Sequence, residues 1–207
     1  MKPQWGLEVH PTVDEMHGPF DLERYAANSN NPPWLSVVPN TPKNELAVDF
    51  SSKEECTGWT AVDDNVMGGI SSSRLTATGH GTAVFSGEVS LAQGGGFASV
   101  RSPSSARPLV ETKELLVRVR GDGSRYQFRL WTSHLNDGVS YMAPLEPKSG
   151  TWQTIRFTTD DFSASRRGQE VRGAPALLLA SVHRFGFLIA ARQAGSFALE
   201  IAWIEGA

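Results

Sequence analysis

Short runs rich in Val, Phe, Thr and Ile dominate the sequence from residue 46 onward, and clusters of Gly, Asp, Asn and Ser separate them. Turn clusters repeated about every 8–12 residues are typical of an antiparallel β-sandwich. No helical repeat of apolar residues competes with this pattern. We therefore predict an all-β sandwich with strands at residues 46–51, 70–75, 82–91, 97–101, 114–120, 125–132, 139–143, 152–157, 184–190 and 196–204.

The first 45 residues differ in composition from the rest. Four prolines between residues 32 and 42 prevent a sustained helix or a central strand there. Four aromatic residues precede position 35, which is more than a free tail needs. We therefore divide the chain into an N-terminal arm, residues 1–45, that packs on a β-sandwich body, residues 46–207. A partner-docking or lid segment is the alternative for the arm.

The clearest turn signal of the body is Gly121-Asp122-Gly123, which lies between two runs of alternating apolar residues. Glycine adopts the positive φ angles that a tight turn requires, and Asp favours turns because its side chain bonds nearby backbone amides. The pattern predicts a β-hairpin over residues 115–130.

Polar and aromatic side chains share one face of this predicted hairpin, because successive side chains of a strand point to opposite sides. Arginine presents a planar fork of donors and tryptophan a flat apolar surface, so such a face suits a sugar, a carboxylate or an enolate-like oxygen. A solvated sheet face and a protein-binding face are the alternatives. The predicted ligand-binding residues are Arg101, Arg118, Gln127, Arg129 and Trp131.

If the protein is an enzyme, two residues of this face are predicted to be catalytic. Arg129 would stabilise developing negative charge, and Tyr141 from a neighbouring strand, or a loop carboxylate, would carry the proton. The reaction would be that of a cofactor-independent cyclase, lyase or isomerase in a biosynthetic pathway. The sequence lacks the motifs of covalent catalysis, zinc hydrolysis, phosphate loops and nicotinamide binding, so we expect no cofactor and no metal.

Charge and cysteine content exclude several other classes. The net charge of −3 provides no basic field for nucleic acid, and the single Cys56 cannot form an intramolecular disulfide. No apolar run is long enough for membrane insertion, and the first residues do not resemble a secretory signal. We expect a cytoplasmic protein whose partner is another protein or a small organic ligand. The excess of Arg over Lys, 14 to 5, is associated with GC-rich bacterial genomes.

Residues 62–73, VDDNVMGGISSS, combine two carboxylates and an amide with a diglycine and three serines. Glycine lets the backbone bend sharply, and Asp64 and Asn65 can accept hydrogen bonds from amides in the turn. We interpret the stretch as a structural corner. A partner-contacting edge and a calcium site are the alternatives, although Ca²⁺ needs six or more oxygens and this segment alone cannot surround it.

The same stretch begins a resemblance that continues to the end of the chain. Residue by residue, the sequence resembles the complex I intermediate-associated protein family. It departs from the family pattern at Asp63, where Asn is usual, and at residues 103–113, which do not align; the arm lies outside the resemblance. The matching positions are residues 64–69 (DNVMGG), 71, 85, 87, 89–91, 95–101 (GGFASVR), 119–123 (VRGDG), 126, 152, 162, 186–187 and 195–204.

The resemblance implies a galactose-binding-like jelly-roll of two antiparallel sheets and, for function, an assembly or biogenesis factor. A fold of this kind also hosts carbohydrate binding and small-molecule chemistry. Three functions therefore stay open at this point. The first is a non-catalytic binding or assembly factor, the second a small-molecule biosynthetic enzyme, and the third a carbohydrate-binding module.

Overall fold

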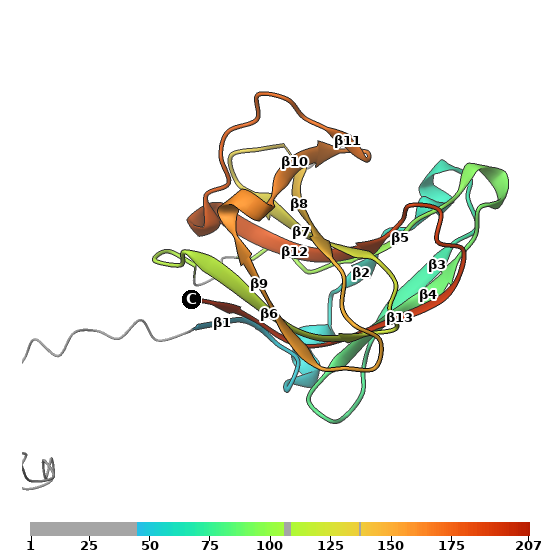
Figure 1. The fold of residues 1–207 in the computed structure, drawn as a ribbon, viewed down its shortest axis with the longest axis horizontal. Coiled ribbons are helices and arrows are strands. Elements are labelled where there is room, and N and C mark those ends of the chain that lie inside the picture. Colours follow the sequence, from blue (N-terminus) through green and yellow to red (C-terminus); the bar gives the residue numbers. More distant parts are fainter. Residues whose placement is uncertain (1–44, 106–108, 137) are drawn as a thin grey trace, which may run out of the picture. The chain divides into compact units, whose positions relative to one another are not determined.

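The structure is a computed structural model that describes residues 45–105, 109–136 and 138–207. It is an all-β fold in which two antiparallel sheets face each other (Figure 1). The prediction that residues 1–45 form an arm packed on the body lies outside the described residues, apart from Glu45.

The first sheet occupies the lower part of Figure 1 and has the strand order β3-β4-β13-β6-β9, with β1 also paired to β13. Its strands are β1 (Glu45–Asp49), β3 (Ser72–Ala77), β4 (Ala83–Val89), β6 (Glu114–Gly121), β9 (Gln153–Thr158) and β13 (Gly195–Gly206).

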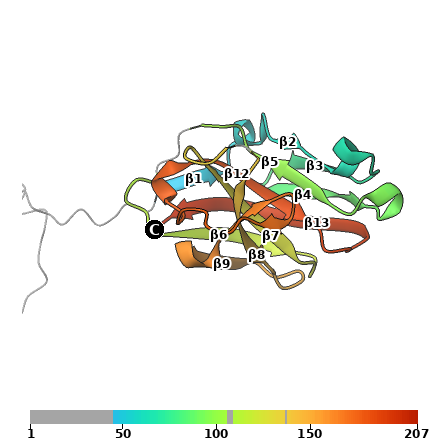
Figure 2. The ribbon, with the colours of Figure 1, turned by 90° about the horizontal axis from the view of Figure 1, so that it is seen from above.

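The second sheet lies above it in Figure 1 and has the order β11-β10-β8-β7-β12-β5-β2. Its strands are β2 (Thr60–Ala61), β5 (Ala98–Arg101), β7 (Tyr126–Thr132), β8 (Ser140–Leu145), β10 (Ser163–Arg166), β11 (Gln169–Glu170) and β12 (Val182–Ile189). Figure 2 shows the molecule from above, at right angles to the first view.

Each of the ten predicted strands overlaps a strand of the structure, so the predicted all-β sandwich is confirmed. Three short strands escaped the sequence analysis, namely β2, β10 and β11. They contain two to four residues, which is too short for an alternating pattern to stand out.

The predicted hairpin over residues 115–130 is wrong. β6 pairs with β13 and β9 in the first sheet, whereas β7 pairs with β12 and β8 in the second, so the turn between them is an arch from one sheet to the other. The Asp122 carboxylate fixes this arch, since it accepts hydrogen bonds from the amides of Ser124 and Ala198 and from the Tyr126 hydroxyl at 2.8–3.0 Å.

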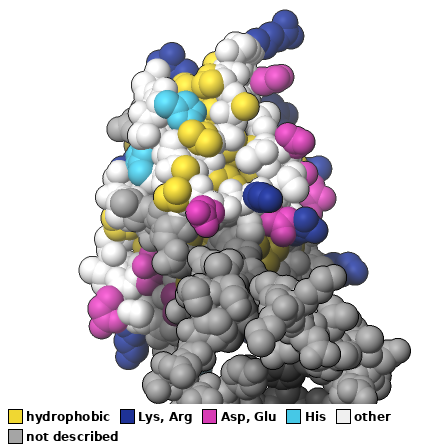
Figure 3. Space-filling view, turned by 90° about the vertical axis from the view of Figure 1, so that its left-hand side faces the viewer, with side chains coloured by type: hydrophobic (Ala, Val, Ile, Leu, Met, Phe, Trp, Pro, Cys, Tyr) yellow, Lys and Arg dark blue, Asp and Glu magenta, His cyan; other side chains and the backbone are white. Residues whose placement is uncertain are grey.

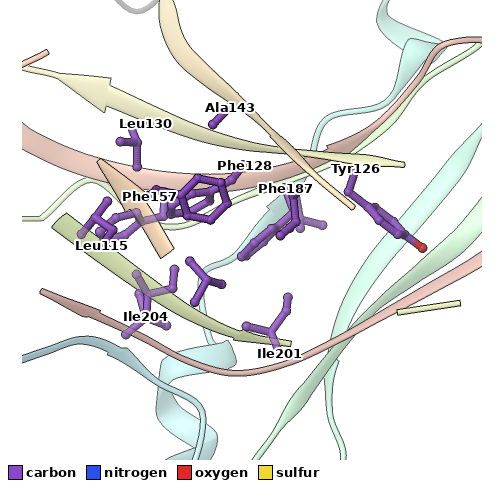
Figure 4. Packing of buried hydrophobic residues seen from close by; sticks show 14 of the residues in the cluster. Leu115, Tyr126, Phe128, Leu130, Ala143, Phe157, Phe187, Ile201 and Ile204 are labelled. Carbon is purple, nitrogen blue, oxygen red and sulfur yellow. The ribbon is translucent and has the colours of Figure 1, made fainter. Parts of the chain in front are cut away.

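The core lies between the sheets and is rich in aromatic rings (Figure 4). The ring of Phe128 from β7 stacks on Phe185 and Phe187 from β12, with centroid distances of 5.9 and 5.5 Å. From the first sheet, Leu115 and Ile201 are fully buried against the same cluster. Burial of side chains of this size contributes about 1.5–3 kcal/mol each. The inward residues therefore stabilise the fold, and the outward ones are available for function.

Candidate functional site

The outer face of the second sheet, the side turned away from the core, gathers the polar and aromatic residues of three adjacent strands. In the strand registers, Gly186 of β12 lies between Arg101 of β5 and Arg129 of β7. Arg184 lies opposite Trp131 in the same pairing. We call this surface the arginine face, and it consists of Arg101, Gln127, Arg129, Trp131 and Arg184.

Trp131 lies within the arginine face and is almost completely covered. A Cβ atom on Gly186 would meet the Trp131 ring at 2.9 Å, so the indole lies across the glycine. The Arg101 guanidinium is placed over the ring, 4.9 Å from its centroid. Only 3% of Trp131 is exposed, so its flat surface is not open for stacking on a ligand. It serves as a support for Arg101 through a cation–π contact.

Arg129 is held by neutral acceptors. Its guanidinium donates to Oε1 of Gln127 at 2.8 and 3.2 Å and to the hydroxyl of Ser140 at 3.2 Å. Burial, together with the positive charge of Arg101, lowers the pKa of Arg129 to about 10. The charged form is therefore less stable here than in water, and a nearby anion would reverse that effect.

Arg184 is the residue of this face that sequence analysis missed. Its Nε atom is buried and has no hydrogen-bond partner among the described residues. The strand at residues 184–190 was predicted, but the local sequence does not reveal that this strand lies between β5 and β7. Its position beside Trp131 depends on that long-range pairing.

The prediction that Arg118 shares this face is wrong, because Arg118 belongs to β6 of the other sheet. Arg118 and its neighbour Arg120 lie over the ring of Trp152, at 5.7 and 5.3 Å from its centroid. Arg120 also forms an ion pair with Glu200. Arg101, Gln127, Arg129 and Trp131 lie together as expected.

Tyr141 lies on the opposite side of the second sheet. Met142 pairs with Arg129, so the alternation along β8 turns Tyr141 toward the interior. Its hydroxyl donates to the carbonyl of Pro175 at 2.8 Å and lies 3.2 Å from Nε2 of His134. Tyr141 lines a pocket of about 400 Å³ beside the 170–177 segment, and burial raises its pKa. The predicted catalytic pair of Arg129 and Tyr141 is therefore not assembled.

The stretch 62–73 forms a corner in which two buried carboxylates hold two loops together with β3 of the first sheet and β5 of the second. Asp63 accepts from the amide and hydroxyl of Ser73 in β3 and from the amide of Ser99 in β5, at 2.6–2.9 Å. Asp64 accepts from the amide and hydroxyl of Ser71 at 2.9 and 2.5 Å. The backbone amides of Gly96 and Phe97, in the loop before β5, also donate to Asp64, at 2.6 and 3.2 Å.

We call Asp63 and Asp64 with these donors the carboxylate clamp. Their oxygens already accept from N–H and O–H groups, which makes them poor ligands for a calcium ion. A Cβ atom on Gly69 or Gly95 would lie 2.3 or 2.6 Å from an Asp64 oxygen, so the clamp requires both glycines. Because Val66 and Met67 in the same loop are 69% and 64% exposed, a partner-contacting edge stays open as an additional role.

The clamp makes a pH-dependent contribution to stability. Burial alone would raise the pKa of Asp64, but the hydrogen bonds from Ser71, Gly96 and Phe97 outweigh it and hold the pKa below its ordinary value. The stabilisation is thus present above the unfolded pKa of about 3.9 and is lost as the pH falls through the lower folded value. We expect the stability difference between the wild type and Asp64→Asn to shrink below about pH 4, measured by urea unfolding from pH 7 to 2. A difference independent of pH would contradict this.

Exposed apolar side chains also occur outside the arginine face. Figure 3 shows hydrophobic side chains gathered near two histidines on the side of the molecule at the left of Figure 1. Among the large hydrophobic residues of the described chain, Val110 and Leu178 are 79% and 60% exposed. Scattered exposed apolar residues are common on monomeric proteins, so they do not define an interface by themselves.

The two facing antiparallel sheets define a jelly-roll β-sandwich of the galactose-binding-like type. The chain belongs to the Complex I intermediate-associated protein 30 family, whose model matches residues 48–201. This confirms the family resemblance drawn from the sequence.

Two animal proteins are similar to the chain. It is 26% identical to "Complex I intermediate-associated protein 30, mitochondrial" of Drosophila melanogaster, over 78% of this chain and 62% of the relative. It is 28% identical to "Probable complex I intermediate-associated protein 30, mitochondrial" of Caenorhabditis elegans, over 78% and 54%. The chain thus spans less than two thirds of either relative. Both names contradict the predicted cytoplasmic location, and the bacterial origin stays a prediction.

Among solved structures, the chain is similar to the Family 11 Carbohydrate-Binding Module of a cellulosomal cellulase of Clostridium thermocellum. The TM-score is 0.57 with 16% identity, over 79% of this chain and 95% of the module. At this identity the likeness shows the fold alone. Within the described residues, no helix is long and apolar enough to cross a membrane.

Proposed function

We propose that the protein is a non-catalytic assembly factor for complex I that binds a partner protein on its arginine face. The observation that carries the proposal is the family match over residues 48–201. The names of both relatives connect them with complex I intermediates, which is the role we extend to this chain. An assembly factor needs binding surfaces and no catalytic centre, and the arginine face offers guanidinium groups for such a contact.

The two other functions have less support in the geometry. An enzyme using Arg129 and Tyr141 would need both side chains on one face, and they lie on opposite sides of the second sheet. A carbohydrate-binding module would use an exposed aromatic ring to stack on a sugar, and the ring of Trp131 is covered by Arg101.

Deletion of the gene in the organism that encodes the protein should reduce assembled complex I and leave subassemblies behind. Blue-native electrophoresis and NADH:ubiquinone oxidoreductase activity measure both quantities. Re-expression of the wild type should restore the complex, whereas Arg129→Ala should restore much less, because truncation of a charged contact at an interface commonly costs about tenfold or more in affinity.

The matched control is Arg74→Ala, since Arg74 is exposed on β3 at the edge of the other sheet. It should restore complex I as the wild type does, and immunoblots and melting curves of each variant exclude loss of the protein itself. Normal complex I in cells without the gene would contradict the proposed function.

A further inference from the structure

We propose that the arginine face binds carboxylates of an acidic segment in the partner protein, and that Arg129 and Arg184 are the residues that take them. This inference rests on the proposed function for the identity of the partner as a protein. The binding of carboxylates by the face is a property of this chain alone and can be measured without the partner.

The first support is the position of the two guanidiniums. Arg184 pairs with Trp131 and Gly186 pairs with Arg129, so the two arginines are diagonal neighbours on adjacent strands. Diagonal residues on one sheet face are about 7–8 Å apart at the backbone, within reach of two long side chains. Both side chains project from the outer face, because their strand neighbours, Phe185 beside Arg184 and Phe128 beside Arg129, are fully buried in the core.

The second support is the contrast between the two sheets. Arg120 and Arg156, which stand on the first sheet, form ion pairs with Glu200 and Glu114. Across the described residues, neither Arg129 nor Arg184 forms an ion pair with a carboxylate. A charge that is partly withdrawn from water without a counter-ion destabilises the fold, so its presence calls for a ligand that supplies the opposite charge.

The third support concerns the individual donors. Arg129 uses Gln127 and Ser140 as neutral acceptors, which orient its guanidinium and leave the charge uncompensated. The Nε of Arg184 is buried and unused among the described residues. Planar guanidinium forks match the two oxygens of a carboxylate in bidentate geometry.

The arrangement of the two guanidiniums selects the kind of ligand. The pocket of about 400 Å³ lies on the other side of the second sheet, at Tyr141, and none of the residues that line it belongs to the arginine face. Two guanidiniums on adjacent strands suit an extended segment with several Asp or Glu side chains better than a small molecule with a single carboxylate. The covered ring of Trp131 leaves charge-assisted hydrogen bonds as the main source of binding.

The test uses the full chain and a hexaglutamate peptide, titrated by isothermal titration calorimetry at low salt, with hexaglutamine as the neutral control. We expect saturable binding of hexaglutamate, no binding of hexaglutamine, and weaker binding as salt is added. Arg129→Ala and Arg184→Ala should each weaken binding by about tenfold, and Arg129→Lys should weaken it less. Arg74→Ala should bind as the wild type does.

Competition separates carboxylate from phosphate. Succinate should displace hexaglutamate at lower concentrations than inorganic phosphate; the reverse order would overturn the assignment to carboxylates. Equal binding by the wild type and by folded Arg129→Ala would overturn the site, as would absence of binding to the wild type. These outcomes are independent of the complex I measurements, so either proposal can fail while the other stands.

Discussion

Replacement of Asp64 by alanine is expected to lower the free energy of unfolding by about 3–5 kcal/mol, because it removes a buried carboxylate that accepts several hydrogen bonds. Asp64 is fully buried and accepts four hydrogen bonds. Without it, the amides of Ser71, Gly96 and Phe97 lose their acceptor, and each unsatisfied buried donor costs about 1–3 kcal/mol. For a domain of this size the melting temperature should fall by roughly 10 °C, measured by circular dichroism.

Asp160→Ala is the control for this result, because Asp160 is exposed in the turn after β9. It should change the stability by less than about 0.5 kcal/mol. If Asp64→Ala melted at the same temperature as Asp160→Ala, the carboxylate clamp would have no part in holding the two loops together.

The second large effect is expected for Gly87→Ala in β4. A Cβ atom at this position would lie 2.0 Å from the carbonyl oxygen of Ser72 and 2.8 Å from the Cα of Ser73. Both atoms belong to the backbone of β3, so no side-chain rotation relieves the clash and the edge of the first sheet must move. We expect a loss of about 3 kcal/mol or more, at the upper end of the range for overpacked sites, measured by urea unfolding.

Gly79→Ala is the control that distinguishes the effect of a steric clash on stability from the effect of backbone strain. Gly79 has a φ of +83° and open space where a Cβ would be, so alanine there should cost only about 1–2 kcal/mol of left-handed strain. A Gly87→Ala variant no less stable than Gly79→Ala would show that β3 can shift freely.

The sequence allowed the strands to be predicted because their signal is local. Alternation along a single strand placed Gln127, Arg129 and Trp131 on one face, and the structure agrees. The pairing of strands is not local. The Gly121–Gly123 turn indicated a reversal of the chain but not that the next strand would enter the other sheet.

The errors at the candidate site follow from this difference. Arg118 was grouped with Arg129 only through the supposed hairpin, so the arch separates them. Arg184 belongs to the site because β12 pairs with β7. The two strands are 50 or more residues apart in the sequence, so no local sequence pattern indicates that they pair. The sequence does not reveal the register between β8 and β7, on which the predicted catalytic role of Tyr141 depends. Met142 pairs with Arg129, so Tyr141 points inward.

The long strand β13 has a consequence for the synthesis of the protein. Residues 195–206 pair with β4, β6 and β1, so the first sheet has no continuous centre until they are present. On the ribosome, β1, β4 and β6 emerge before their shared neighbour and expose unpaired backbone edges during that interval. Folding of this sheet must therefore wait until β13 has been synthesised, and a chain truncated before residue 195 would lack the strand that joins β1, β4 and β6.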